Sequence, residues 1–528
     1  MLKIKIKNNW LWFGQLVLFT LVVIHARPLI PIDETRYLSV AWEMWQNNDF
    51  LVPHINGLPY SHKPPLFFWT IHLFWWIFGV GQWSARLVAP FFGFIAILLT
   101  IGIAKKLWPS DGWVARNVPF ILLGMVVWGV YTSLTMFDTM LICFCLLAYL
   151  FIIKAARQES FFPWFGLGCA IGLGLLAKGP VVLVYVLPPA LSAPWWKREG
   201  LASPGKWYGG MLFALAVGVG IGLCWAIPAA KAGGPEYGRA ILFGQTAGRV
   251  VNSFAHGRPF YWYFLLLPML LFPWSFWLPS RQGFKGYSLD QGSRFCLAVL
   301  LPAFIILSSI SGKQIHYILP LLPVTALLLA RLISGSERFG GSDRIIISVF
   351  MLMFIVFSFL ALLNSDGGDR ELLQFMPRWI GVVPFFCGCL LFWLPSSGLE
   401  TSIRRLSATA MLLVLGLHLA ISPALFSLYG HEKLGEIMGK IQKDGGQIAV
   451  LPGDLKDQFQ FAGRLTRPVA FFDNWHLLVD WMKAHPEQYV LLFTRDSVED
   501  RVRNTDMVRR YKNGWLTLAR AGNFFPGP

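Results

Sequence analysis

The sequence is poor in charged residues. Only 14% of its 528 residues are Asp, Glu, Lys or Arg, and 55% are hydrophobic, whereas a soluble globular protein carries about 25% charged residues. Long apolar runs recur from Trp10 to about Phe426, and helices can satisfy the backbone hydrogen bonds of such runs within lipid. The composition therefore argues against an ordinary soluble enzyme and predicts a polytopic membrane protein.

Signatures of several soluble enzymes are also missing. The chain has no G-x-S-x-G elbow, no P-loop G-x-x-x-x-G-K-[ST], no H-E-x-x-H and no Rossmann fingerprint. It has no internal repeat and no low-complexity region either. No small-residue cleavage site follows the first apolar run, so we expect this run to be a membrane helix rather than a signal peptide.

Cysteine is scarce and absent from the polar C-terminal region. All seven Cys lie in apolar runs, so no disulfide is expected in the residues after about Tyr429. The pairs Cys143/Cys145 and Cys387/Cys389 lack the spacing of a zinc site. We expect all seven to be small buried residues.

The apolar runs predict about 13 membrane spans, since a span needs about 20 apolar residues. The spans are predicted near residues 10–27, 84–104, 118–135, 137–153, 161–177, 180–195, 208–228, 260–279, 295–311, 316–333, 345–363, 378–395 and 406–426.

Basic residues in the short loops predict the orientation. If Lys3, Lys5 and Lys7 are cytoplasmic, every loop that this count places in the cytoplasm carries at least two Lys or Arg, as the positive-inside rule expects. These loops explain the net charge of +17 without nucleic acid, although a basic site for an anionic lipid or phosphate is the other explanation. An odd number of spans places the C-terminal region outside.

Two segments differ from the predicted spans. Residues 28–83 contain two stretches, Tyr37–Trp45 and Leu66–Phe78, which we expect to form helices in the headgroup plane. In the C-terminal region, QIAVLP, PVAFFD and YVLLFT predict short strands, and HEKLGEIMGKIQ and HLLVDWMKAH predict amphipathic helices between them. We therefore predict an all-α polytopic membrane region over residues 1–428 and a small external α/β domain over 429–528.

Charges that do not follow the orientation rule gather on the predicted external face. Arg binds phosphate bidentately and Lys binds it as a point charge, while a neighbouring carboxylate can act as a general base or stabilise charge. Such a set suits the transfer of a group from a lipid phosphate or diphosphate, because cations stabilise the leaving phosphate. The set comprises Asp33, Arg36, Lys63, Asp138, Lys178, Arg258 and Lys313, with Tyr317 beside them.

Each of these residues also has a structural explanation. An Asp just before a helix is a favoured N-cap, and a basic residue at the membrane edge can extend to headgroups or anchor a turn. The first explanation applies to Asp33 and Asp138, and the second to Arg36, Lys63, Lys178 and Lys313. We expect Glu34 to be structural.

Two histidines raise the question of a metal. His62 and His256 lie in the predicted external loops, and imidazole suits zinc and similar divalent ions. Two histidines at the membrane surface without fixed spacing are the alternative. No other cofactor is expected.

The order of the motifs resembles a known family. DETRY, SHKPP, FDTML, LLAKGPVVL, HGRPFYWY and SGKQIHYILPLLP resemble, in this order, the bacterial lipid A aminoarabinose transferases, which are grouped with the protein O-mannosyltransferases in the GT-C class. The resemblance runs from about Met1 to Arg331 and includes the general plan of spans followed by a small external domain. It implies an inverting glycosyltransferase of the bacterial inner membrane. The sugar would move from undecaprenyl (polyprenyl) phosphate to lipid A or another envelope acceptor, on the periplasmic face.

The resemblance also implies roles for individual residues. Asp33 matches the acidic residue of the family's first external loop to which catalysis is attributed, and Asp138 matches a second Asp of the family. The residues that the resemblance and the charge pattern assign to the donor phosphate are Arg36, Tyr37, Lys63, Lys178, Arg258, Lys313 and Tyr317. A His62/His256 pair would stand where relatives have a Glu and a His that resemble a metal site.

The sequence departs from the family at two motifs, and other functions stay open. His62 replaces the Glu that precedes the family's Lys, and KQIHYILP replaces a KLPTYILP-like motif, so the sugar and acceptor could differ from aminoarabinose and lipid A. A transporter or flippase of an anionic polyprenyl-linked lipid is the main alternative, although transporters favour midplane charges and inverted repeats. A membrane scaffold whose C-terminal region binds a partner is another.

Overall fold

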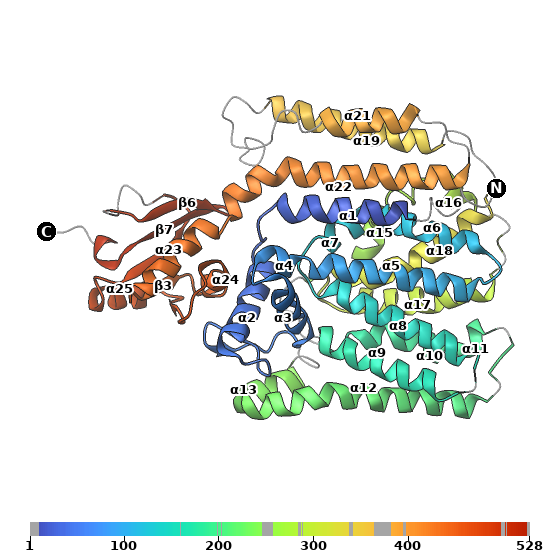
Figure 1. Cartoon of the computed structure of the whole chain (residues 1–528), viewed down its shortest axis with the longest axis horizontal. Coiled ribbons are helices and arrows are strands. Elements are labelled where there is room, and N and C mark those ends of the chain that lie inside the picture. The colour runs from blue at the N-terminus through green and yellow to red at the C-terminus, as the bar shows by residue number, and fades with distance from the viewer. Residues whose placement is uncertain are drawn as a thin grey trace.

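The structure is a computed structural model with two regions joined by a short segment. It describes residues 10–524 except 159, 198, 202, 245–256, 284–286, 288, 337–341, 364–381, 394–397, 498–501 and 503. Figure 1 shows a bundle of long, roughly parallel helices and, at the opposite end of the molecule, a region built around a sheet. Residues 33–86 lie between the two, at one end of the bundle.

The bundle is formed by apolar helices around a core rich in large aromatic side chains. Trp128, Trp196, Trp274 and Trp277 are fully buried in it. Its elements are α1 (Leu11–His25), α5 (Val88–Leu107), α6 (Gly112–Leu123), α7 (Val126–Thr132), α8 (Asp138–Ala155), α9 (Phe162–Lys178), α10 (Val182–Leu191), α11 (Ala193–Trp196), α12 (Pro204–Ala232), α13 (Gly234–Arg239), η1 (Ala240–Gly244), α15 (Trp262–Leu270), α16 (Leu278–Gln282), α17 (Gln291–Ser309), η2 (Ile315–Leu321), α18 (Leu322–Ser334), α19 (Ser342–Leu363), α21 (Val382–Trp393) and α22 (Leu399–Tyr429).

Each predicted span overlaps one or two of these helices, and in the predicted span 260–279 the short helices α15 and α16 are separated by the non-helical residues 271–277. Among the described residues, six helices are long and apolar enough to cross a membrane, and seven if the pair α6 and α7, bent by 68°, counts as one span. Others are too short to qualify, such as α1 and α9, and α10 contains Pro188 and Pro189 near its end. The multi-pass helical membrane fold is thus confirmed, with several helices shorter than predicted.

Residues 33–86 form a small subassembly against the end of the bundle. Both predicted helices are present, although the first is longer than the stretch that predicts it. Phe67, Phe68 and Trp75 on the second are buried in a cluster with residues of the first. The elements are α2 (Asp33–Asn47), β1 (His54–Ile55), β2 (Leu58–Pro59), α3 (Leu66–Phe78) and α4 (Gln82–Arg86).

The C-terminal region is a five-stranded mixed sheet with helices. The strand order is β4-β3-β5-β7-β6, with β3 parallel to β4 and β5 and β7 antiparallel to β5 and β6. The predicted small α/β fold is therefore correct here, whereas its boundary at residue 429 stays a prediction. The elements are α23 (Glu432–Lys443), β3 (Ile448–Leu451), η4 (Gly453–Asp457), α24 (Gln460–Gly463), β4 (Ala470–Phe471), α25 (Trp475–Ala484), β5 (Tyr489–Thr494), β6 (Met507–Tyr511), β7 (Gly514–Arg520) and η6 (Ala521–Phe524).

Two predictions need correction. The predicted strands do not include the hairpin of β6 and β7, which turns at Lys512 with a positive φ of 51°. The sequence Asn513-Gly514 is a hairpin signal that could have revealed it. The expected burial of all cysteines is confirmed for Cys143, Cys145 and Cys296, whereas Cys169, Cys387 and Cys389 are half-buried. It is wrong for Cys224, which is exposed because it lies on α12, a helix with few buried residues.

Candidate functional site

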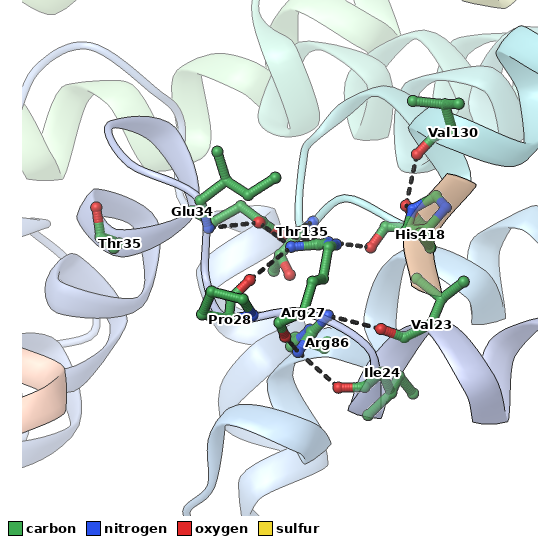
Figure 2. A network of polar contacts seen from close by, with 12 residues as sticks. Val23, Ile24, Arg27, Pro28, Glu34, Thr35, Arg86, Val130, Thr135 and His418 are labelled. Atoms are coloured by element: carbon green, nitrogen blue, oxygen red, sulfur yellow. Dashed lines mark hydrogen bonds and ion pairs between the residues drawn. The ribbon is translucent and has the colours of Figure 1, made fainter. Parts of the chain in front are cut away.

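A buried ion pair fixes the start of α2. Arg27 follows α1 and donates two hydrogen bonds to the Glu34 carboxylate, Nη1 to Oε2 at 2.5 Å and Nη2 to Oε1 at 3.0 Å. The same carboxylate accepts from the backbone N–H groups of Ile30 and Thr135 (Figure 2). Burial raises the pKa of Glu34, but Arg27 and these hydrogen bonds outweigh it and lower the pKa to about 2. Glu34 is therefore structural, as the sequence predicts.

The pair belongs to a network that connects five segments, namely the ends of α1 and α7, the start of α2, α4, and α22. Arg27 also donates to the carbonyl of Ser133 at 2.5 Å, and the Ser133 hydroxyl contacts Nε2 of His418 on α22 at 3.2 Å. Arg86 of α4 donates to the carbonyls of Val23, Ile24 and Arg27 (Figure 2). These segments are thus held together. Since Asp33 is next to Glu34, and Asp138 follows Thr135 closely, the network positions the backbone of both predicted catalytic residues.

Asp33 lies at the exposed first turn of α2. Its Oδ1 accepts a hydrogen bond from the Tyr37 hydroxyl at 3.1 Å, one helical turn further on. The N-cap residue is Ile32, and no side chain caps the helix. The capping explanation for Asp33 is therefore wrong, because Asp33 is the first residue of the helix and its carboxylate accepts from Tyr37 instead. Burial, followed by the charge of Asp33, raises the pKa of Tyr37 well above its ordinary value. Tyr37 therefore stays a hydrogen-bond donor to Asp33 at neutral pH.

Asp138 pairs with Lys178. The two side chains come from the first residue of α8 and the last residue of α9, and Nζ lies 2.5 Å from Oδ1. Both are nearly inaccessible, with side-chain exposures of 3% for Asp138 and 9% for Lys178. The capping explanation is wrong for Asp138 as well, because Phe137 is the N-cap residue and no side-chain cap is made.

Aromatic rings connect this pair to Asp33. The ring of Phe137 lies 4.9 Å from that of Tyr37 and 5.7 Å from Nζ of Lys63. On the other side, Nζ of Lys178 lies 5.6 Å from the ring of Tyr317. Residues that are far apart in the sequence therefore meet: two carboxylates and two ammonium groups share one aromatic-lined neighbourhood. This is the convergence that the sequence predicts, although the roles of these residues stay predictions.

Lys313 and Arg258 lie in two adjacent loops. A backbone bridge joins Gly257 to Gly312, and the buried Lys313 ammonium donates to the carbonyls of Arg258 at 2.9 Å and Ile310 at 2.5 Å. Burial lowers the pKa of Lys313. The side chain of Arg258 is exposed, 5.9 Å from the ring of Trp262. Lys313 thus anchors a turn, which is the structural explanation given for it above. Phosphate binding by Lys313 or Arg258 stays a prediction.

The side chain of Arg36 contacts the C-terminal region, which the sequence does not predict. Its Nε lies 3.7 Å from Oδ2 of Asp457, in η4 of the C-terminal region. This places the side chain at the boundary between α2 and the sheet region, one turn along the helix from Asp33.

The predicted metal site of His62 and His256 stays a prediction. His256 lies outside the described residues. His62 is exposed, with its ring 5.2 Å from that of Tyr60. Within the described part of the chain, no three His, Cys, Asp or Glu residues are grouped as metal ligands. His62 could supply one of the four ligands of a tetrahedral zinc site, and its proposed partner His256 lies outside the described residues.

Two residues of this neighbourhood are not among those that the sequence predicts, namely His316 and Arg27. His316 lies close enough to Asp138 for an electrostatic interaction with its carboxylate. The ring of His316 lies 4.7 Å from that of Tyr317 and 6.3 Å from that of Tyr131. The sequence signal that could have revealed His316 is its place in the motif KQIHYILP, directly before the predicted site residue Tyr317. Arg27 is hidden at the end of an apolar run, where its partner Glu34 is the only indication of a buried pair.

The sequence is similar to those of known proteins. Residues 62–221 match the family described as dolichyl-phosphate-mannose-protein mannosyltransferase. A protein of Pectobacterium atrosepticum named undecaprenyl phosphate-alpha-4-amino-4-deoxy-L-arabinose arabinosyl transferase is 29% identical over 328 residues, 60% of this chain and 57% of that protein. A protein of the same name from Pseudomonas paraeruginosa is 32% identical over 324 residues, 59% and 57% of the two chains. The chain thus spans little more than half the length of these relatives.

Solved structures show the same fold. The crystal structure of ArnT from Cupriavidus metallidurans bound to undecaprenyl phosphate superposes with a TM-score of 0.72 and 16% identity, covering 98% of this chain and 99% of that one. Its apo state gives 0.73 at 15% identity, with 98% of both chains covered. Residues 62–221 thus resemble the dolichyl-phosphate-mannose-protein mannosyltransferase family, and the whole chain has the fold of ArnT.

Proposed function

We propose that this protein is a glycosyltransferase that moves a sugar, aminoarabinose or a related one, from undecaprenyl phosphate to lipid A or another envelope acceptor. The observation that carries the proposal is the meeting of Asp33, Asp138, Lys63 and Lys178 around the aromatic residues Phe137 and Tyr317. The names of its relatives and the undecaprenyl phosphate in a structure of the same fold indicate the donor.

The proposed reaction is a single displacement at the anomeric carbon. An oxygen of the acceptor forms the new bond to this carbon, while the bond to the phosphate oxygen of the donor breaks and undecaprenyl phosphate leaves with the electron pair. Lys63 and Lys178 are the cations placed to stabilise the charge that grows on this phosphate.

Asp33 takes the acceptor's proton in this scheme if the acceptor is a hydroxyl group. If the acceptor is an ionised phosphate, no proton has to be removed, and Asp33 acts through its charge and its position. Tyr37, which donates to Asp33, orients the carboxylate in both cases. Asp138 sets the position of the Lys178 ammonium through their close contact.

The proposal also includes the orientation in the membrane. The basic loops favour a cytoplasmic N-terminus, which places residues 33–86, the candidate site and the C-terminal region in the periplasm. A donor that is anchored in the bilayer by its prenyl chain would reach the site from the side.

The test is sugar transfer by the purified protein. Undecaprenyl phosphate carrying radiolabelled aminoarabinose is incubated with lipid A, and mass spectrometry identifies the product. We expect label to move to lipid A with the wild-type protein and not with Lys63→Ala. Equal transfer by both proteins contradicts the proposed site, and no transfer to any lipid of an envelope extract contradicts the proposed activity.

A further inference from the structure

The C-terminal region is held firmly against residues 33–86. Nε1 of Trp42 and Nε2 of Gln46 donate to the carbonyls of Leu465 and Thr466, and the buried Asn56 exchanges two hydrogen bonds with the backbone of Val469. These contacts involve the second half of α2 and the β1–β2 turn. They join the two regions at positions outside the first turn of α2.

At that first turn, the contact between Arg36 and Asp457 is a poor ion pair. Nε and Oδ2 are 3.7 Å apart, which is too long for a hydrogen bond. Nε of Arg36 and Oδ1 of Asp457 are both buried atoms without a hydrogen-bond partner in the described part of the chain. The side chains keep exposures of 22% and 15%, so the pair is reachable from solvent. A guanidinium in this state would bind a better anion if one arrived.

Arg36 lies where an anionic group of a substrate would be expected to bind. Residues three apart on a helix share a face, so Arg36 lies on the face of α2 that carries Asp33. A phosphate offers the planar guanidinium two acceptor oxygens at once, a geometry that Arg favours. The contact with Asp457 offers the guanidinium only one oxygen, at 3.7 Å from Nε.

We propose that Asp457 is the resting counter-ion of Arg36, and that the phosphate group of a lipid substrate replaces it during binding. The C-terminal region then sets how tightly the site holds that phosphate, because it supplies the anion that must be displaced. This inference rests on the proposed function for the nature of the lipid. The phosphate can belong to the undecaprenyl donor or to the lipid acceptor, which share the chemistry that Arg36 recognises.

The test compares binding of each lipid to the full-length wild-type protein and to Asp457→Asn in detergent micelles. Removing a partly exposed competing charge should tighten binding by about two- to fivefold. Tighter binding of undecaprenyl phosphate alone assigns the donor, and tighter binding of lipid A alone assigns the acceptor. Asp454→Asn is the matched control, since Asp454 lies in the same short helix and is exposed. It should leave both affinities unchanged.

A second variant separates displacement from a general effect of charge. In an Arg36→Met background, Asp457→Asn should no longer tighten binding, because the two residues act as a pair. Equal tightening with and without Arg36 overturns the inference, and so does unchanged or weaker binding by Asp457→Asn. If the wild-type protein binds neither lipid, the proposed function fails together with the inference, whereas failure of the variants alone leaves the function standing.

Discussion

Two ion pairs at the first turn of α2 differ in almost every respect. Arg27 and Glu34 are buried, joined by two hydrogen bonds, and bonded further to the backbone (Figure 2). Arg36 and Asp457 are 3.7 Å apart and partly exposed, and each has a buried atom without a partner among the described residues. Glu34 and Arg36 are two residues apart, so they point to different sides of the helix.

The difference shows how one helical turn can serve two purposes. The inner side of α2 is tied to α1, α4 and the segment before α8, and this fixes where the backbone of Asp33 lies. The outer side keeps Asp33 exposed and Arg36 partly exposed, so both are available for substrates, while the buried Tyr37 supports Asp33 from beneath through its hydroxyl. We therefore expect changes on the inner side to alter stability, and changes on the outer side to alter transfer or affinity.

The largest expected effect is on the inner side. Glu34→Ala leaves the Arg27 guanidinium buried without its partner, and such a loss costs about 3–5 kcal/mol. The measurement is thermal or denaturant unfolding of the protein in detergent. The control is Asp457→Asn in the outer pair, which should change the free energy of unfolding by less than about 1 kcal/mol. Similar losses in the two variants would remove the distinction between the pairs.

The inner pair also predicts a pH dependence of stability. The pKa of Glu34 is about 2 in the folded protein, below its ordinary value of 4.5. A lowered pKa means that the carboxylate stabilises the fold fully above pH 4.5 and loses this contribution as the pH falls toward 2. The difference in unfolding free energy between wild type and Glu34→Gln should therefore shrink by ~3 kcal/mol over that range. A difference that is flat below pH 4.5 would contradict the assignment.

The pair of Asp138 and Lys178 should act on transfer as well as on stability, because removing Lys178 leaves Asp138 buried without its partner. Lys178→Met removes a cation proposed to stabilise the leaving phosphate, and losing one such group lowers the rate by roughly 100-fold. Lys178→Arg retains the charge and should recover part of the rate. Lys154→Met, at the other end of α8, is the control and should transfer sugar at the wild-type rate. A similar loss in both Met variants would indicate a general effect of removing a helix-end lysine.

The smallest expected effect concerns the orientation of Asp33. Tyr37→Phe removes the hydrogen bond that the hydroxyl donates to the carboxylate. A hydrogen bond to a charged group contributes on the order of 1.5 kcal/mol or more, so sugar transfer should fall by about tenfold. The exposed Tyr261 provides the control, since Tyr261→Phe should leave the rate within about twofold of wild type. An unchanged rate in Tyr37→Phe would show that Asp33 needs no such support.

Much of the fold and part of the site could be predicted because their signals are local. Apolar runs indicated the helices of the bundle, and charges at the ends of those runs indicated Asp138 and Lys178, which the structure places 2.5 Å apart. The strands of the C-terminal region followed from short apolar stretches. The β6–β7 hairpin was missed because Arg509 and Arg510 interrupt the apolar pattern that reveals a strand.

The rest depends on contacts between distant segments. Nothing in the sequence around Arg36 indicates Asp457, and nothing around Glu34 indicates the N–H group of Thr135. The expected N-caps were wrong for the same reason: Asp33 and Asp138 stand at helix starts, but Tyr37 and Lys178 are better partners than a backbone N–H group. Local propensity identifies the position, and tertiary contacts decide what the side chain does there.

The central claim is that the outer side of α2 performs the chemistry. The measurement that tests it most directly is single-turnover sugar transfer by Asp33→Asn, with its thermal unfolding recorded in parallel. We predict a fall in rate of about 100-fold or more, with an unfolding temperature unchanged from wild type. A rate within about twofold of wild type in the folded variant would contradict the assignment of Asp33, and with it the division of work between the two sides of the helix.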